Sequence, residues 1–261
     1  MRTENLCSYE KLNIAAIKDC VPGSVYYFDS VDSTNSKAKL SKNVPDKSIF
    51  VAETQKSGRG RMGRNWSSPA GCGLWLSIYL VPDILAEDIS KITLLAGLAV
   101  SRTIPGSSIK WPNDVLLGDK KVCGILTEAV ADSEGIKCVV VGIGINVNTQ
   151  AFPEELADKA TSLYLETGKK QKRENVLNSV LKEFFLLYES FIKNGFSDIY
   201  DEYIQKCITI GKDVLLIRNN EETKATAIGM TDTGELLVDI AGNREVVNSG
   251  EVSVRGLLGY N

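Results

Sequence analysis

Arginines and glycines alternate in a loop that runs from Glu53 to Trp66 between two apolar, strand-like segments. Its glycines let the backbone approach a ligand closely, and guanidinium groups suit carboxylate or phosphate oxygens. The three arginines are Arg59, Arg61 and Arg64. Because the chain carries a formal net charge of -3, this basic loop is a local exception. We therefore predict that the loop wraps an anionic small molecule.

A dinucleotide-binding turn is the first alternative for this loop, since its glycines match Gly-x-Gly-x-x-Gly. That motif requires a helix directly after the turn, whereas residues 65–71 lead into another strand-like run. The chain contains no Gly-x-x-x-x-Gly-Lys-Ser/Thr, so a P-loop nucleotide enzyme is not supported. A solvated surface loop with incidental arginines remains open, although it fits poorly with an acidic chain.

Three further polar clusters interrupt apolar runs, a position where functional sites are common. Residues 32–35 precede a helix-like segment, and they are explained equally well as a helix N-cap or as a ligand site. Residues 110–114 break a strand pair with a lysine, an indole, a proline and polar side chains. Lys121 opens a buried-looking strand, where it is either solvated or a fixed positive charge facing a pocket.

The elements that must position these residues are strands and helices in alternation. Runs of apolar and aromatic residues punctuated by turns predict strands over 25–28, 49–52, 74–81, 108–111, 114–117, 122–130 and 138–147. The spacing of apolar residues predicts helices over 35–40, 87–103, 173–193 and 196–206. We therefore predict an α+β fold in which helices cover a mixed, largely antiparallel sheet.

The pattern of predicted elements changes after Gly211. Short strands separated by turn residues are predicted over 214–217, 223–230, 235–240 and 245–247. This pattern is typical of a small antiparallel barrel. We place a domain boundary near 207–211.

Composition excludes several classes of function. The chain has 261 residues and no histidine, which rules out Ser-His-Asp and Cys-His catalysis and histidine-ligated metals. Its acidic pI near 5.3 argues against broad binding to nucleic acid. No signal peptide or apolar run of membrane-spanning length is present, so we expect a soluble, cytoplasmic protein that does not bind membranes.

The spacing of the cysteines indicates whether they bind metal or form disulfides. No Cys-x-x-Cys pair occurs, so neither a zinc cage nor a dense disulfide framework is expected. We expect reduced and mostly buried thiols at Cys7, Cys20, Cys72, Cys123, Cys138 and Cys207.

Taken together, the polar clusters resemble those of the biotin protein ligase family. The matching segments are Ser33-Thr34-Asn35, Gln55-x-x-Gly-Arg-Gly-Arg-x-Gly-Arg64-x-Trp66, Lys110-Trp-Pro-Asn-Asp114, Lys121-x-x-Gly124-Ile-Leu and Gly142-x-Gly-x-Asn146. They occur in the family's order and span most of the chain. The resemblance implies a class II synthetase-like catalytic domain over residues 1–209, followed by a C-terminal SH3-like β-barrel over 210–261. Residues 251–255 are similar to the closing motif of that barrel.

The resemblance also implies a two-step reaction. ATP and biotin form biotinyl-5'-adenylate and pyrophosphate, and a specific lysine of a biotin carboxyl carrier domain then displaces AMP. Lys121 would bridge the biotin carboxylate and the α-phosphate, while Arg59 and Arg61 would clamp both anions as the loop excludes water. These three residues are the expected catalytic set.

The implied binding residues divide between the two substrates. Biotin would be held by Ser33, Thr34, Asn35, Gln55, Arg59, Gly60, Arg61, Lys121 and Gly124. ATP would be held by Arg61, Arg64, Trp66, Lys110, Asn113, Asp114 and Asn146. Asp114 is also a candidate ligand for Mg²⁺ bound with ATP, because Mg²⁺ prefers carboxylate and phosphate oxygens. No tightly bound prosthetic group is expected, and Trp111 is equally well explained as a core residue.

Two features depart from the family's best-known bacterial form. About 24 residues precede the first predicted strand, too few for a winged helix-turn-helix, so we expect a ligase that does not bind DNA. Met62 stands where many members carry a basic residue, which leaves ATP affinity open.

Other classes of protein remain as alternatives. A lipoate ligase or acyltransferase of similar fold is the main one, although its Arg-Arg-x-x-Gly-Gly-Gly-x-Val-x-His pattern is absent. Cys72 or Cys123 could carry an acyl group, but burial is the commoner fate of cysteine. An RNA-binding loop would need wider positive charge than this chain has. The sequence does not distinguish a monomer from a homodimer.

Overall fold

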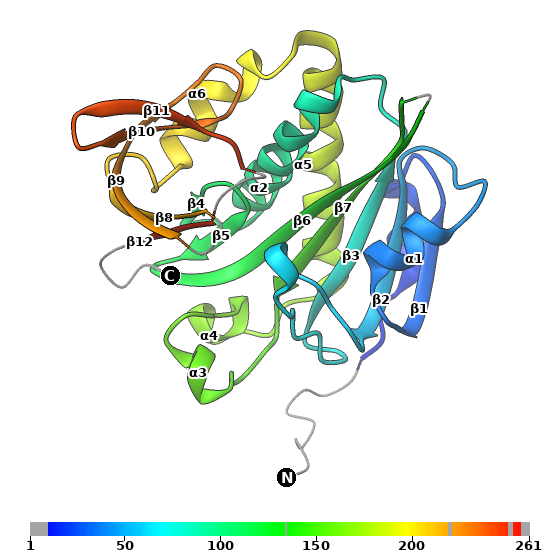
Figure 1. The fold of residues 1–261 in the computed structure, drawn as a ribbon. Helices are drawn as coiled ribbons and strands as arrows, with labels where there is room; N and C mark the ends of the chain where they lie inside the picture. The colour runs from blue at the N-terminus through cyan, green and yellow to red at the C-terminus, as the bar shows by residue number, and fades with distance from the viewer. Residues whose placement is uncertain (1–9, 134, 219–220, 250–252, 257–261) are drawn as a thin grey trace.

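Two β-sheets organise the protein, seen in a computed structural model that describes residues 10–133, 135–218, 221–249 and 253–256. The larger sheet has seven strands in the order β1-β2-β3-β7-β6-β5-β4 (Figure 1). These strands are β1 (Val25–Val31), β2 (Ser48–Gln55), β3 (Gly73–Leu80), β4 (Ser107–Lys110), β5 (Asp114–Leu117), β6 (Lys120–Asp132) and β7 (Gly135–Asn146). Every strand predicted for this part of the chain is present.

Pairing within the large sheet is antiparallel except between β1 and β2. The parallel pair follows from its connection, because helix α1 (Thr34–Leu40) carries the chain back to the starting edge between the two strands. The predicted α+β class with a largely antiparallel sheet is confirmed.

Helices cover both faces of this sheet, as Figure 1 shows. Helices α2 (Ile89–Thr103) and α5 (Arg173–Asn194) pack together on one face, and their apolar stripes join a core that includes Val141, Ile143 and Ile145 of β7. Because side chains alternate along a strand, the residues between these three point to the opposite face, where α1 lies. The predicted helices 87–103, 173–193 and 196–206 correspond to α2, α5 and α6 (Ser197–Lys206).

Short helical segments complete the fold. They are the 3₁₀ turns η1 (Ile14–Ala16), η2 (Lys18–Cys20), η3 (Arg61–Gly63) and η4 (Ala86–Asp88), and the helices α3 (Glu154–Ala157) and α4 (Leu163–Thr167). None of the sequence patterns predicted α3 or α4, because segments of four or five residues are too short to show a helical period.

A second, five-stranded sheet forms the C-terminal part, in the order β11-β10-β9-β8-β12. Its strands are β8 (Asp213–Arg218), β9 (Glu221–Met230), β10 (Leu236–Ile240), β11 (Asn243–Val247) and β12 (Ser253–Gly256). The last strand contains part of the motif at 251–255, of which residues 251 and 252 lie outside the described residues. A small separate β domain is therefore confirmed, while the division at 209/210 stays a prediction.

Hydrogen bonds from the segment after β4 and from α6 connect the first part of the chain to the C-terminal β domain. The indole Nε1 of Trp111 donates to the Gly234 carbonyl at 3.1 Å, and the Tyr200 hydroxyl donates to the Met230 carbonyl at 2.8 Å. Trp111 is 1% exposed and belongs to the hydrophobic core, and it also lines the cavity described below, so both explanations offered for it remain open.

One cysteine departs from the expected pattern. Cys72 is disulfide-bonded, which corrects the prediction that it is a reduced thiol. A disulfide joins residues that folding brings together, and spacing along the chain does not reveal such a pair. Cys20, Cys123, Cys138 and Cys207 are free, and Cys7 lies outside the described residues. Among the described helices, none is long and apolar enough to cross a membrane.

Candidate active site

A cavity of about 550 Å³ lies on the α1 face of the large sheet. Every residue predicted to act in catalysis or to bind biotin, ATP or Mg²⁺ lines it, although these residues come from five separate segments of the chain. They are Ser33, Thr34, Asn35, Gln55, Arg59, Gly60, Arg61, Arg64, Trp66, Lys110, Asn113, Asp114, Lys121, Gly124 and Asn146. The fold thus brings the whole predicted set together, and the role of each member stays a prediction.

Three glycines line the sheet side of this cavity, where a larger side chain would not fit. Gly142 and Gly144 are two residues apart on β7, and Gly124 of β6 pairs with Gly144, so all three face the same side of the sheet. A β-carbon at 124 would lie 2.8 Å from the Trp66 ring. One at 144 would overlap the Trp66 indole, and one at 142 would overlap the Asn35 amide. The glycines therefore make room for the side chains that line the site.

The turn at Ser33 forms one wall. Ser33 is the N-cap of α1, and its hydroxyl accepts from the Ser36 amide at 3.5 Å, so the N-cap interpretation of this motif is correct. The backbone amide of Thr34 donates to Gln55 Oε1 at 2.9 Å, which connects the turn to the end of β2. Capping and cavity lining coexist at this turn.

Lys121 lies at the start of β6, near the end of the basic loop at Trp66. Its Nζ is 2.6 Å from Asp114 Oδ1 and 5.1 Å from the centroid of the Trp66 ring. The backbone of Lys121 is held by residues 159–161, because its amide donates to Lys159 O at 2.8 Å and its carbonyl accepts from Thr161 N at 2.9 Å. A cation fixed in this way suits the neutralisation of ligand oxygens.

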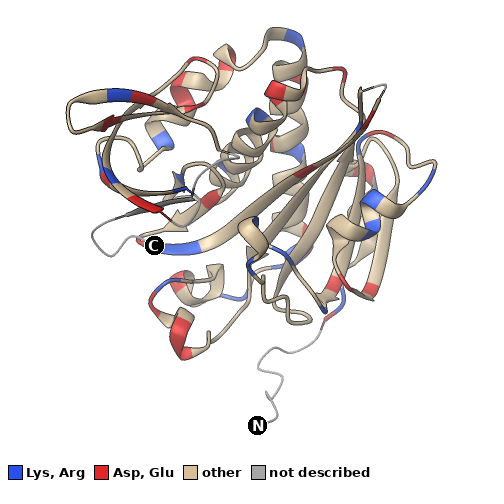
Figure 2. Ribbon diagram, in the orientation of Figure 1, with Lys and Arg blue, Asp and Glu red and all other residues tan. Residues whose placement is uncertain are grey.

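The basic loop closes on itself and reaches the C-terminal sheet. Arg59 forms a β-bridge with Asn65, and the 3₁₀ turn η3 lies between them. The Arg61 guanidinium donates to Asn113 Oδ1 at 2.9 Å and to the carbonyl of Ser249. Burial lowers the pKa of Arg61, while the charge of Asp114 opposes this shift. Figure 2 shows the basic segments of this loop and of the start of β6 within a ribbon of otherwise mixed charge.

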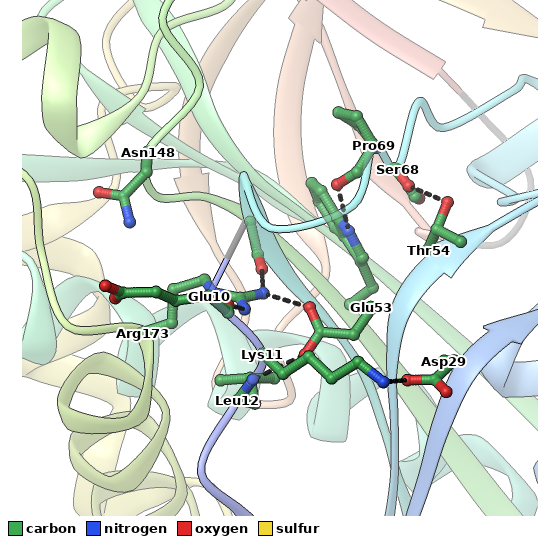
Figure 3. Close-up of polar contacts among 12 residues, drawn as sticks. Glu10, Lys11, Leu12, Asp29, Glu53, Thr54, Ser68, Pro69, Asn148 and Arg173 are labelled. Carbon is green, nitrogen blue, oxygen red and sulfur yellow. Dashed lines mark hydrogen bonds and ion pairs between the residues drawn. The ribbon is translucent and has the colours of Figure 1, made fainter. Parts of the chain in front are cut away.

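A buried ion pair anchors the base of the loop, as Figure 3 shows. Glu53 is fully buried, and its Oε2 accepts from Arg173 at 2.9 Å. Its Oε1 accepts from the Leu12 amide and from the Tyr27 hydroxyl, both at 2.7 Å. Arg173 also donates to the Gly73 carbonyl at 3.1 Å. The last strand residues before the loop are thereby tied to β1, β3 and the start of α5.

Comparisons with known proteins agree with this geometry. A model described as the Biotin/lipoate A/B protein ligase family matches residues 27–146, and one for the Biotin protein ligase C terminal domain matches residues 209–255. The bifunctional ligase/repressor BirA of Bacillus spizizenii is 36% identical over 87% of this chain and 73% of the relative. The chain belongs to the biotin protein ligase family.

Two further relatives extend this result. The biotin--[acetyl-CoA-carboxylase] ligase of Paracoccus denitrificans is 30% identical over 86% of this chain and 98% of the relative. The biotin protein ligase from Aquifex aeolicus, solved in complex with biotin and ATP, superposes with a TM-score of 0.80 at 35% identity. That superposition covers 89% of this chain and 99% of the Aquifex chain. Membership of this ligase family, expected from the motifs, is confirmed.

The cysteine alternative loses support in this biotin ligase fold. Cys123 is fully buried, and burial raises the pKa of its thiol, so it remains protonated at neutral pH. Cys72 is already disulfide-bonded. Neither residue offers the exposed thiolate that an acyl carrier requires.

Sequence analysis missed two parts of the site. Several residues between 149 and 160 line the cavity, and Lys159 and Thr161 hold the backbone of Lys121, but this segment carries no recognisable motif. Ser77 lies behind the cavity wall, where its hydroxyl contacts Thr34 and Asn35. The only signal for Ser77 in the sequence is that a polar residue interrupts the apolar run of β3. The Ser77 residue is 0% exposed.

Proposed function

We propose that this ligase activates biotin with ATP and then transfers it to a lysine of a carrier domain. In the first step, an oxygen of the biotin carboxylate attacks the α-phosphorus of ATP. The bond from that phosphorus to the oxygen bridging the β-phosphate breaks, and pyrophosphate leaves with this oxygen and the bonding electron pair. In the second step, the ε-amine of the acceptor lysine attacks the biotinyl carbonyl carbon. AMP leaves, an amide forms and the amine loses its proton.

The observation that carries this proposal is the placement of Lys121 on the same cavity as the Ser33–Asn35 turn and the basic loop. Two anions must meet in the first step, so their mutual repulsion has to be neutralised where they react. Lys121 supports both anions from the strand, and Arg59 and Arg61 support them from the loop. The Ser33 turn and Gln55 supply donors and acceptors for the ureido group of biotin.

Asp114 fits a role in holding Mg²⁺ with ATP. It is a carboxylate on the cavity wall, and Mg²⁺ is commonly bound by one or two carboxylates together with substrate phosphates. Within the described ranges, no group of three or more His, Cys, Asp or Glu side chains could bind a metal by itself. Mg²⁺ would neutralise charge on the phosphates, and the phosphates would complete its coordination.

The proposed acceptor is the biotin carboxyl carrier domain of acetyl-CoA carboxylase. The Paracoccus relative, 98% of which is covered by the alignment, is named for that substrate. The acceptor lysine must reach the biotinyl carbonyl carbon in the cavity that Lys121 lines.

The test is pyrophosphate release with ATP and Mg²⁺ and with biotin, lipoate or neither. Of these three mixtures, we expect pyrophosphate release only in the one that contains biotin. A purified carrier domain added to that mixture should then become biotinylated, which streptavidin detects. Equal release with and without biotin would contradict the proposal. Release that prefers lipoate would favour the lipoate ligase alternative.

A further inference from the structure

The Asn35 side chain is held by a hydrogen-bond network that lies behind the cavity wall. Its Nδ2 donates to the Leu126 carbonyl at 3.0 Å and to Glu128 Oε2 at 2.8 Å, and its Oδ1 accepts from the Ser77 hydroxyl at 2.5 Å. Asn35 is 4% exposed and Ser77 is 0% exposed. Neither Ser77 nor Glu128 lines the cavity.

This network fixes which way the amide of Asn35 points. A flipped amide would place its oxygen against the Leu126 carbonyl and the Glu128 carboxylate, both of which only accept hydrogen bonds. Glu128 stays ionised, because Lys39 pairs with its other oxygen. Burial by itself would raise the pKa of Glu128, but the hydrogen bonds from Lys39 and Asn35 outweigh it and the pKa is lowered.

The network also limits what Asn35 can offer a ligand. Both N–H groups of its amide are used by Leu126 and Glu128. Its oxygen has two lone pairs, and Ser77 is its one donor among the described residues. Asn35 can therefore present only an acceptor to the cavity that it lines.

Ser77 extends the same control to Thr34. The Ser77 oxygen is 2.7 Å from Thr34 Oγ1. Because the one Ser77 proton is donated to Asn35, this contact is a hydrogen bond when the Thr34 hydroxyl donates to Ser77 in place of Gln55 Oε1, which is 3.2 Å away. Ser77 pairs with Gly142 in the sheet, and the missing side chain at that position leaves room for the Asn35 amide. A single buried hydroxyl on β3 thus supports two residues of the cavity wall.

We propose that Ser77 and Glu128 are positioning residues that hold Asn35 as an obligate acceptor and so select a ligand head group that donates N–H. This inference rests on the proposed function, in which the ureido group of biotin is that head group. Glu128 acts through the amide nitrogen of Asn35, and Ser77 acts through its oxygen.

The experiment measures the dissociation constant for biotin by calorimetric titration of the full chain. Ser77→Ala and Glu128→Leu should each raise it about tenfold, the effect of one lost hydrogen bond of ordinary strength. The KM for ATP should stay unchanged, because none of the residues expected to hold ATP belongs to the network. Combined with Asn35→Ala, either substitution should add little further loss, since its effect passes through Asn35.

A matched control removes a hydroxyl pair on the other face of the sheet. Thr93 donates to Thr127 at 2.7 Å beneath α2, so Thr93→Ala should leave the biotin dissociation constant unchanged. Thermal melting checks that each variant is folded. If one variant does not fold, the other still tests the proposal, because the two residues hold opposite ends of the same amide.

Two results separate this inference from the proposed function. A wild-type chain that does not bind biotin would overturn both. A wild-type chain that binds biotin, with Ser77→Ala and Glu128→Leu binding it equally tightly, would overturn the positioning role alone. The positioning role would also be overturned if the losses of biotin affinity from Ser77→Ala or Glu128→Leu added in full to the loss from Asn35→Ala.

Discussion

The ε-amine of Lys121 lies 2.6 Å from the carboxylate of Asp114 across the β5–β6 hairpin, on the wall of the cavity. The two side chains are 26% and 17% exposed, so water screens their attraction only in part. The pair holds Lys121 over the Trp66 ring, and both partners remain within reach of a ligand in the cavity.

Lys121→Ala should abolish most of the biotin-dependent pyrophosphate release. Removing one preorganised charge-stabilising donor typically lowers kcat by about 10²–10³-fold. The measurement is the initial rate of release at saturating ATP. Lys120→Ala is the matched control, because it removes the same positive charge from the neighbouring residue. The Lys120 amine donates to the Ala157 carbonyl. Equal rates for wild type and Lys121→Ala would remove Lys121 from the catalytic set.

Gly144→Ala should displace Trp66 from the cavity floor. The added β-carbon would overlap the partly buried Trp66 indole, so the ring has to move. We expect the KM for ATP to rise about tenfold, as one base–aromatic stacking contact is worth roughly 1–3 kcal/mol. Gly229→Ala in β9 is the control, because its new methyl group would lie 3.7 Å from Leu237 in ordinary contact. An unchanged KM would show that Trp66 does not contact the nucleotide.

Arg173→Met should destabilise the fold strongly. Glu53 is fully buried, and loss of its partner leaves an uncompensated charge, which typically costs about 3–5 kcal/mol. Urea unfolding measures the change. Arg102→Met removes a partly exposed arginine that pairs with Glu183 and Glu202, and it should cost below about 1 kcal/mol. Similar losses for both variants would mean that the Glu53 pair does not act as a buried anchor.

Glu128 should make the stability of the protein sensitive to acid. Because its pKa is lowered in the fold from the ordinary value of 4.5, the unfolded chain takes up the proton first as pH falls. The contribution is therefore complete well above pH 4.5 and is lost as pH falls through the lower folded pKa. Urea unfolding of wild type and Glu128→Gln across this range should converge in acid. A constant difference at all pH values would contradict the ionised pair.

Local patterns in the sequence predicted much of this protein. Apolar runs bounded by turn residues predicted all seven strands of the large sheet, and β5 spans the predicted residues 114–117. The helical spacing behind α2 and α5 is a property of neighbouring residues and needs no tertiary context. Motif order identified the ligase family and nominated residues that share one cavity.

Only the tertiary structure decided how those residues are supported. Ser77 reaches Asn35 across 42 residues, Arg173 reaches Glu53 across 120, and Arg61 reaches Ser249 across 188. The disulfide of Cys72 likewise escaped the spacing argument. Such contacts join residues far apart in the chain, so they depend on which strands and helices come together in space, and patterns among neighbouring residues do not specify that. The sequence therefore determined the chemistry available at the site, and folding determined which buried partners orient it.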